Sequence, residues 1–494
     1  MTTRETTAPV TPVTPGAPGP ARRRVGAAVL GALTRLPDGA VLLALTAAVV
    51  MIGWLQKYPC NDGHSPPDYG WTHACYTDVL PLYGGRGFGE GHLPYLDSLI
   101  EYPVLIGLYM GVIGLPIHWL NAAGLLSGPA HALGFGGVDE GLVFFWATAF
   151  FNGLLVLATT RMLLALRRNR PTDVLLWVLA PGMALAFTVN WDMLAVAPAV
   201  AGLLAWQRRR PGLAGVLLGI GTAAKLFPVM ILFPLVLLCL RRRTPEGRRV
   251  ALRVVLGAAG AWLVLNVPFA IANFTNWWEA YRFSRDRWID WGTLYFLGDH
   301  LSTPLGLHDQ VWSAVGQVDD LNRTSALLFL LALAGIATLI LRAPRPPRVA
   351  AMAFLTVAAF LLTNKVWSQQ FVLWLVPLAV LARPRWKAIL LWQAVEVAYL
   401  LAFLRSVIAG RDDYALVQTA LARYVAVAAL AVMVIVEALR PEQDPLRGPD
   451  LADPDAGPLA EEPVPAGARV PAEVSAPSAP QVGPGHPDLG EQLA

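Results

Sequence analysis

Long apolar segments recur through most of this chain, and they restrict the folds open to it. Residues 39–55 and 415–439 are two examples, and about 20 apolar residues suffice for a helix to cross a bilayer. The chain of 494 residues is 55% hydrophobic and only 15% charged, whereas a soluble domain carries about 25% charged residues. We therefore predict an all-α polytopic membrane protein with about 12 to 14 transmembrane helices and a large first extracytoplasmic loop.

Short arginine clusters separate the apolar segments and predict the topology. Arg22, Arg23, Arg24 and Arg35 precede the first span, and later clusters lie at 167–170, 208–210, 241–243, 342–348 and 383–387. Cytoplasmic loops carry the excess of Lys and Arg, so we expect both termini in the cytoplasm. Residues 57–102 and 273–322 then form two extracytoplasmic segments. The net charge of +4 comes with these clusters and does not indicate a nucleic-acid partner.

Composition divides the chain into three regions. Residues 1–36 are rich in Thr, Pro and Ala, and residues 441–494 are rich in Pro, Ala, Asp and Glu. Both are predicted to be disordered cytoplasmic tails around a membrane domain at 37–440. One part of this domain allows two topologies. Residues 104–120 and 142–166 both resemble spans, so 121–140 is either extracytoplasmic or part of a weak extra span.

The first polar loop, from Cys60 to Pro103, combines carboxylates, aromatic residues and Gly turns, a composition typical of sugar handling. Its cysteines, Cys60 and Cys75, are expected to form a disulfide if the loop faces an oxidising compartment; the alternative is two free thiols. Asp78 lies in this loop before an apolar stretch. A carboxylate near an apolar surface can act as a general base, but Asp78 is also well placed to cap a helix.

Other ionisable residues lie at the edges of apolar segments, where a charge needs a reason. Glu101 and Tyr102 precede a span and are either a site pair or an entry cap with an aromatic belt residue. Lys225 and Lys365 lie in tips between spans, where each could bind a lipid phosphate or snorkel from a helix end.

A second candidate segment runs from Trp277 to Trp291. Its tryptophans could stack on sugars, Arg285 and Arg287 could bind phosphate, and His300 follows it. The alternative is an interfacial amphipathic helix. The histidines of the first loop lack metal-ligand spacing, and the sequence has no CxxC, HExxH or phosphate-binding loop motif. We therefore expect no metal and no nucleotide cofactor.

Several stretches of the chain, taken in order, resemble the polytopic lipid-linked-sugar glycosyltransferases of the GT-C type, and most closely glycosyltransferase family 87 of actinobacteria. The resemblance extends over about residues 39 to 439. The stretches are Tyr76–Tyr83, Pro94–Tyr95, Glu101–Pro103, Asn190–Asp192, Gly219–Pro228 and Asn364–Phe371.

The resemblance implies a GT-C-type bundle, with Asp78 as the general base. The implied donor is a polyprenyl-phosphate sugar, with mannose expected, and the implied acceptor is a cell-envelope glycolipid or glycan. Lys225 would stabilise the leaving phosphate, helped by Lys365, Arg285 or Arg287. The complete set of expected substrate-binding residues is Glu101, Tyr102, Asn190, Asp192, Lys225, Arg285, Arg287, His300, Lys365 and Gln369.

Two other functions remain open at this point. A carrier or flippase for lipid-linked glycans would share the membrane helices and interfacial cations, but it would need no carboxylate base and often shows inverted repeats. A catalytically inactive scaffold of cell-envelope assembly would tolerate neutral substitutions in the first loop. The sequence leaves the oligomeric state open.

Overall fold

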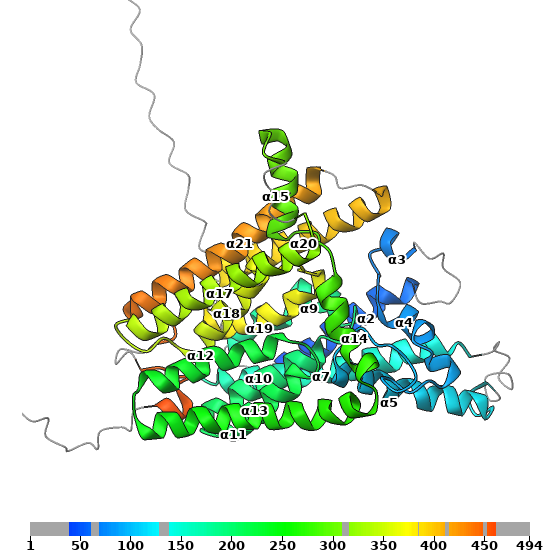
Figure 1. The fold of residues 1–494 in the computed structure, drawn as a ribbon, viewed down its shortest axis with the longest axis horizontal. Coiled ribbons are helices and arrows are strands. Elements are labelled where there is room, and N and C mark those ends of the chain that lie inside the picture. Colours follow the sequence, from blue (N-terminus) through cyan, green and yellow to red (C-terminus); the bar gives the residue numbers. More distant parts are fainter. Residues whose placement is uncertain are drawn as a thin grey trace, which may run out of the picture. The chain divides into compact units, whose positions relative to one another are not determined.

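The structure is a computed structural model that describes residues 39–60, 69–127, 138–308, 316–383, 385–410, 414–447 and 452–460. Within these ranges it is a helical protein without β-strands (Figure 1). The N-terminal tail predicted at 1–36, and most of the tail predicted from 441 onwards, lie outside the described residues.

Seven helices in the described ranges are long and apolar enough to cross a membrane. They are α2 (Ala40–Lys57), α5 (Val104–Ala122), α7 (Glu140–Leu166), α13 (Pro245–Ala272), α17 (Val318–Arg342), α20 (Trp386–Ala409) and α21 (Tyr414–Leu439). Shorter apolar helices are α10 (Met193–Gln207), α11 (Pro211–Thr222), α12 (Phe227–Arg241), α18 (Val349–Thr363) and α19 (Val372–Ala382). The fold class is therefore the predicted one, an all-α polytopic membrane protein.

The remaining helices are short or polar and lie in the connections between the apolar ones. They are α3 (Tyr69–Thr72), α4 (Val79–Gly85), α8 (Leu175–Val178), α9 (Pro181–Ala186), α14 (Phe274–Asp286) and α15 (Leu294–Ser302). Several begin at conventional signals. Pro181 occupies the first turn of α9, and the side chains of Asn273 and Thr293 accept hydrogen bonds from backbone N–H groups of α14 and α15.

Small residues allow α11 and α13 to pack closely. A Cβ added at Gly215 would lie 2.0 Å from the carbonyl oxygen of Val254, and one at Gly219 would lie 2.3 Å from that of Ala258. Close backbone approach through small residues is a common way for membrane helices to pack.

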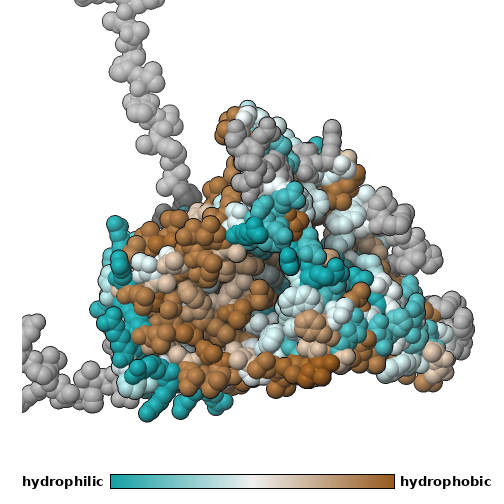
Figure 2. All heavy atoms as spheres, in the orientation of Figure 1, coloured by the Kyte–Doolittle hydropathy of each residue, from teal (hydrophilic) through white to brown (hydrophobic). Residues whose placement is uncertain are grey.

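Helices α18 and α19 are buried over most of their length and form the centre of the core. The helices around them expose apolar side chains, for example Leu256 on α13 and Leu330 on α17. Figure 2 shows such apolar residues gathered on one face of the bundle.

Helix α5 lies beside the stretch before Arg167 whose topology the sequence left open. Near its start, the N–H of Leu105 donates to the carbonyl of Ala223. Near its end, Asn121 donates a hydrogen bond of 2.8 Å to Glu140, the first residue of α7. Midway, the Tyr109 hydroxyl lies 3.3 Å from Asn152 in the middle of α7. Helix α5 therefore pairs with the first half of α7 only, and Arg167 lies beyond it at the far end of α7.

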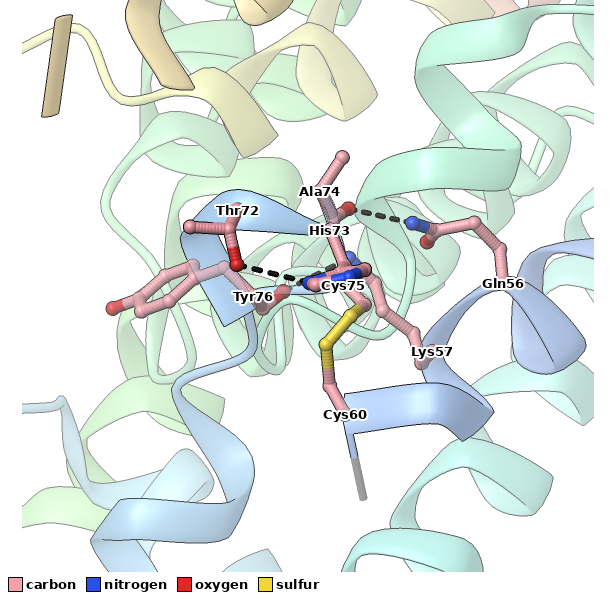
Figure 3. Close-up of a disulfide and its surroundings, with 8 residues drawn as sticks. All are labelled: Gln56, Lys57, Cys60, Thr72, His73, Ala74, Cys75 and Tyr76. Carbon is pink, nitrogen blue, oxygen red and sulfur yellow. Dashed lines mark hydrogen bonds between the residues drawn. A yellow bond between two sulfur atoms is a disulfide. The ribbon is translucent and has the colours of Figure 1, made fainter. Parts of the chain in front are cut away.

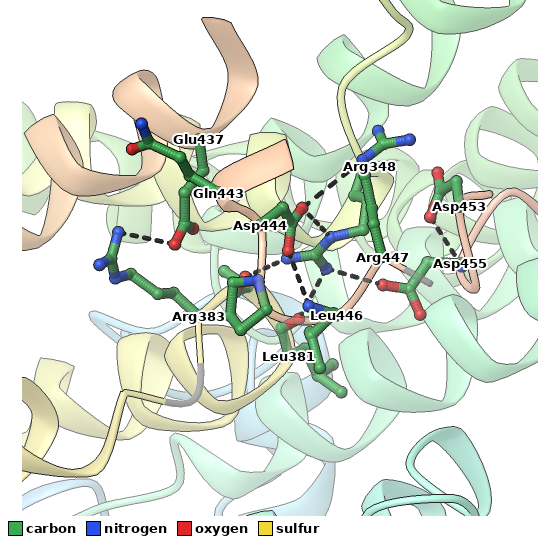
Figure 4. Close-up of polar contacts among 12 residues, drawn as sticks. Arg348, Leu381, Arg383, Glu437, Gln443, Asp444, Leu446, Arg447, Asp453 and Asp455 are labelled. Atoms are coloured by element: carbon green, nitrogen blue, oxygen red, sulfur yellow. Dashed lines mark hydrogen bonds and ion pairs between the residues drawn. The ribbon is translucent and has the colours of Figure 1, made fainter. Parts of the chain in front are cut away.

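The arginine end of the bundle, which carries Arg167 and Arg348, is closed by a C-terminal strap, residues 441–447 and 452–460 (Figure 4). Asp455 accepts hydrogen bonds from Arg167 at 2.8 Å and from Arg348 at 3.1 Å, while Asp444 accepts from Arg348 at 2.6 Å. All four side chains are buried. This differs from the expected disordered tail beginning at 441. Buried guanidinium groups need counter-ions, and the acidic residues of the strap supply them.

Candidate active site

The opposite end of the bundle, called the aspartate end here, gathers the tips between helices. The N–H of Asp78 donates to the carbonyl of Val189 at 2.8 Å, and the Thr77 hydroxyl donates to that of Thr188 at the same distance. These bonds attach the first loop to the tip between α9 and α10. Asp78 directly precedes α4, yet its side chain makes no capping hydrogen bond. Its carboxylate is therefore available for contacts outside the helix.

Three side chains surround the carboxylate of Asp78. The Tyr76 hydroxyl donates to Oδ1. On the other oxygen, Oδ2, the Asn190 side-chain amide donates at 3.4 Å and the Tyr102 hydroxyl at 3.5 Å. Burial raises the pKa of Asp78 above its ordinary value, against the opposing effects of the hydrogen bonds and of Lys225. A carboxylate with a raised pKa is a better proton acceptor than an exposed one.

Tyr102 also connects Asp78 to a buried ion pair. The Nζ of Lys225 lies 4.6 Å from the centre of the Tyr102 ring, a cation–π distance. The same Nζ lies 3.8 Å from Oδ2 of Asp192, whose side chain is only 1% exposed. The other oxygen of Asp192 accepts a hydrogen bond of 2.7 Å from Trp374. Residues from four separate parts of the chain therefore meet around one tyrosine.

Glu101, directly before Tyr102 in the chain, is a second carboxylate of the first loop. It forms an ion pair with Arg86, with 2.6 Å between Nε and Oε2. The Glu101 side chain is 12% exposed and that of Arg86 is 31% exposed. The charge of Glu101 raises the pKa of Asp78 further. Both residues belong to the first polar loop.

The second candidate segment places a pair of cations beside this group. The Lys365 ammonium donates to the backbone carbonyls of Arg285 and Arg287, both at 2.6 Å, and so holds the end of α14. Burial and the charge of Arg287 lower the pKa of Lys365 to about 8. The Arg287 guanidinium lies 3.5 Å from Asp290, and its charge opposes the rise in the pKa of Tyr76 that burial causes.

The other predicted residues have partners other than Asp78 in the described part of the chain. Gln369 lines a pocket together with Tyr76. Arg285 forms an exposed ion pair of 3.2 Å with Asp319. His300 lies in α15, with its Nδ1 3.0 Å from the carbonyl oxygen of Phe296 in the same helix.

The pocket lined by Gln369 and Tyr76 is partly open and has a cavity volume of about 50 Å³. Its walls are mainly apolar and come from α9, α19 and α20, with Leu185, Val372 and Phe403 among them. Its polar lining residues are Lys57 and Tyr76 beside the first loop, Gln369 before α19 and Glu396 on α20. Apolar walls of this kind suit a short piece of an apolar chain.

Two residues of the site were not singled out from the sequence. Tyr76 is one aromatic residue among many in the first loop, and only the structure shows its hydroxyl on Asp78. Asp290, 7% exposed, receives a hydrogen bond of 3.0 Å from Ser368 as well as the Arg287 ion pair. The position of Asp290 between Trp288 and Trp291 is the sequence feature that could have pointed to it. Among the described residues, no group of three or more His, Cys, Asp or Glu side chains is arranged to hold a metal ion.

The structure joins Cys60 and Cys75 by a disulfide (Figure 3). Cys60 ends the short 3-10 turn after α2, and Cys75 directly precedes Tyr76. Two side chains from the last turn of α2 reach the same loop: Gln56 donates to the carbonyl of Ala74 at 2.6 Å and Lys57 to that of Tyr76 at 2.8 Å. The first loop is thus fixed to the end of the first membrane helix.

Membrane-spanning helices that gather carboxylates, cations and aromatic rings at one end are suited to sugar transfer beside a lipid surface. Residues 123–364 of the chain match the model of glycosyltransferase family 87. The chain belongs to this family and is a membrane glycosyltransferase of the GT-C superfamily. A comparison with curated proteins gives no match. The matched stretch includes Asn190, Asp192 and Lys225, whereas Asp78 precedes it and Lys365 follows it.

Proposed function

We propose that this glycosyltransferase moves a hexose, with mannose as the expected sugar, from polyprenyl phosphate to a glycolipid or glycan acceptor of the cell envelope. The observation that carries the proposal is the surroundings of Asp78. Its carboxylate contacts the hydroxyl of Tyr102, and the ring of the same tyrosine lies under Lys225. A proton acceptor and a cation therefore lie on either side of Tyr102.

Asp78 is the general base in this proposal. It takes the proton of an acceptor hydroxyl while that oxygen forms a bond to the anomeric carbon of the donor. The bond between the anomeric carbon and the phosphate oxygen breaks at the same time, and its electron pair leaves with polyprenyl phosphate. Attack opposite the leaving group inverts the anomeric centre, so a β-linked donor yields an α-linked product.

The leaving phosphate gains negative charge, and Lys225 is the cation proposed to stabilise it. Positive groups already in place when charge develops contribute strongly to catalysis. Asp192 keeps the ammonium of Lys225 in position from the buried side. Arg287 is the second proposed phosphate ligand, because Asp290 holds its guanidinium group and Lys365 holds its backbone carbonyl.

The remaining substrate contacts follow from the same arrangement. Glu101 and Asn190 are proposed to bind sugar hydroxyls, since Asn190 contacts Asp78 and Glu101 directly precedes Tyr102, which also contacts Asp78. The apolar pocket beside Tyr76 is proposed to take part of the prenyl chain. The reaction needs no ATP and no metal in this proposal, because the bond between sugar and phosphate supplies the driving force.

The arginine clusters favour a cytoplasmic position for the arginine end and for both termini. The aspartate end then faces the extracytoplasmic side, where a disulfide is stable. Reaction of a membrane-impermeant thiol reagent with a cysteine introduced at the exposed Asp97 of intact cells tests this orientation. Labelling only after the cells are opened would contradict it.

The proposed activity is tested by sugar transfer in membranes that contain the wild-type protein or Asp78→Asn. Radiolabelled polyprenyl-phosphate mannose is supplied with native lipid extract. Asparagine keeps the size of the side chain and removes the base, so the variant is expected to lose transfer while accumulating normally. Asp97→Asn is the matched control, because Asp97 lies in the same loop, is exposed and bonds only to a nearby backbone N–H in the described contacts.

Equal labelling by wild type and Asp78→Asn would refute the role of Asp78. If the wild type labels no product with this donor, the donor assignment is wrong, and other polyprenyl-phosphate hexoses are supplied next. Movement of a lipid-linked glycan across the membrane without any transfer would favour the carrier function.

A further inference from the structure

We infer that Tyr76 is a positioning residue for Asp78, and that the Cys60–Cys75 disulfide holds Tyr76 in the geometry that this role requires. The inference rests on the proposed function of Asp78 as the base. It adds a dependence of the active site on the oxidised state of the first loop.

The anchoring of Tyr76 is visible in the backbone that leads to it. Cys75 is 1% exposed, and its disulfide to Cys60 spans 5.9 Å between Cα atoms. The preceding residue, Ala74, has a φ of 58°, a left-handed conformation that is uncommon for residues other than glycine. Hydrogen bonds from Gln56 and Lys57 hold the carbonyls on either side of Cys75 (Figure 3). The chain therefore enters Tyr76 from a turn that is fixed by three separate connections to the end of α2.

The ring of Tyr76 is held as well as its backbone. It stacks on Trp71 with 3.9 Å between ring centres and 16° between ring planes. Trp71 in turn packs edge-on against Phe403 of α20. Stacking on a ring that is itself packed restricts the tyrosine to one orientation, and in that orientation its hydroxyl meets Asp78.

The hydroxyl of Tyr76 is the close partner of the carboxylate. The other two donors, Asn190 and Tyr102, share Oδ2 at 3.4 and 3.5 Å, which are long for hydrogen bonds. Without the Tyr76 hydroxyl, Oδ1 would lose its donor and the carboxylate would be free to turn. Burial raises the pKa of Tyr76 above its ordinary value, so the hydroxyl stays protonated and remains a donor at neutral pH.

Loss of the Tyr76 hydroxyl changes the pKa of Asp78, and therefore the rate of transfer, in a known direction. A hydrogen bond to the ionised carboxylate lowers its pKa, so loss of the bond raises the pKa of Asp78. The base is then protonated over a wider acidic range, and transfer falls most at low pH. A hydrogen bond to a charged group corresponds to about one pKa unit or more.

Tyr76→Phe tests this inference, because phenylalanine keeps the stack on Trp71 and removes only the hydroxyl. We expect the acidic limb of the profile of kcat against pH to move up by about one unit. At a pH on that limb, kcat is then about tenfold lower than in the wild type, and the loss shrinks towards high pH. The KM for the donor is expected to stay unchanged. Tyr83→Phe is the matched control, since its hydroxyl bonds to Glu140 instead, at 2.6 Å.

The disulfide is tested in the same assay with Cys60→Ser, and with wild-type membranes treated with a dithiol reductant. Both are expected to lower kcat at low pH, and Cys60→Ser is expected to add little to Tyr76→Phe because the two changes act through one side chain. The treated wild type keeps the test valid if Cys60→Ser fails to accumulate, and thiol labelling reports whether the bond was reduced.

Two results would overturn the inference: an unchanged pH profile in Tyr76→Phe, or full activity after confirmed reduction of the disulfide. Failure of the proposed function looks different. In that case Asp78→Asn transfers sugar as well as the wild type does. An inactive Asp78→Asn together with an unchanged Tyr76→Phe profile refutes only the role of Tyr76.

Discussion

The contact between Lys225 and Asp192 allows a structural role and a catalytic role of one lysine to be separated. Lys225→Met removes the cation and leaves the carboxylate of Asp192, 1% exposed, without the ammonium that lies 3.8 Å away. Two unit charges about 4 Å apart interact by about 4 kcal/mol at the effective dielectric constant of about 20 that fits most protein sites. Loss of one member of a buried pair costs about 3–5 kcal/mol. We therefore expect Lys225→Met to be destabilised by several kcal/mol and inactive.

The double variant Lys225→Met, Asp192→Asn is the informative one. It has no uncompensated charge, and the introduced asparagine side chain keeps an oxygen for the hydrogen bond from Trp374. Stability should therefore recover, with a coupling energy of about 3 kcal/mol between the two changes. Transfer should not recover, because the cation proposed for the leaving phosphate is still absent. A missing group of this kind lowers kcat by about 100- to 1000-fold.

Both quantities are measurable on the purified protein in detergent. The midpoint of thermal unfolding, followed by tryptophan fluorescence, ranks the stability of the wild type, the two single variants and the double variant, and transfer is assayed on the same samples. A double variant with both stability and activity restored would show that Lys225 only neutralises Asp192. A stable but inactive Lys225→Met single variant would refute the energetic argument, since Asp192 would then need no counter-ion.

Three further outcomes are expected. Burial raises the pKa of Asp78 above its ordinary value of 3.8, so the acidic limb of the profile of kcat/KM against pH should lie above pH 3.8. An acidic limb at or below pH 3.8 would contradict this pKa shift. Arg287→Ala should raise the KM for the donor about tenfold or more, because it removes a charge-assisted phosphate contact. Arg282→Ala is the control and should leave this KM within about twofold, since the Arg282 side chain is 58% exposed and pairs with Glu279. Equal effects of the two substitutions on KM would contradict the phosphate role of Arg287. Asp455→Asn should lower the midpoint of thermal unfolding, because it removes a carboxylate buried between two arginines at a cost of about 3–5 kcal/mol, and an unchanged midpoint would show that the strap does not stabilise the arginine end.

Hydropathy and composition were sufficient to predict the fold class, an all-α polytopic membrane protein. They could not place α5. A mainly apolar helix of 19 residues is long enough for a full crossing, and only its contacts with the first half of α7 show where it lies in the bundle. Composition also predicted disorder throughout 441–494, because Pro, Ala, Asp and Glu are poor core residues. The partners of Asp444 and Asp455 are 96 and 107 residues away at Arg348, and no local pattern reveals such pairs.

In the candidate site, too, single residues could be predicted from the sequence, but the contacts between them could not. Asp78, Asp192 and Lys225 could be selected one by one, because a charge beside an apolar segment needs an explanation. Their meeting around Tyr102 follows from the packing of α10 and α11 and was not visible in the sequence. Lys365 illustrates the limit of selection by charge. Its ammonium is largely engaged with backbone carbonyls at the end of α14, and it supports the segment that presents Arg287.

The strap has a consequence for how the chain is made. Arg167 emerges from the ribosome 288 residues before Asp455, the carboxylate with which it pairs. Until Asp455 has been translated, the guanidinium groups of Arg167 and Arg348 have no access to the whole strap, so the arginine end of the bundle cannot close. Chains that stop short of Asp455 would keep an open, charged end and so be recognisable to proteases as unfinished.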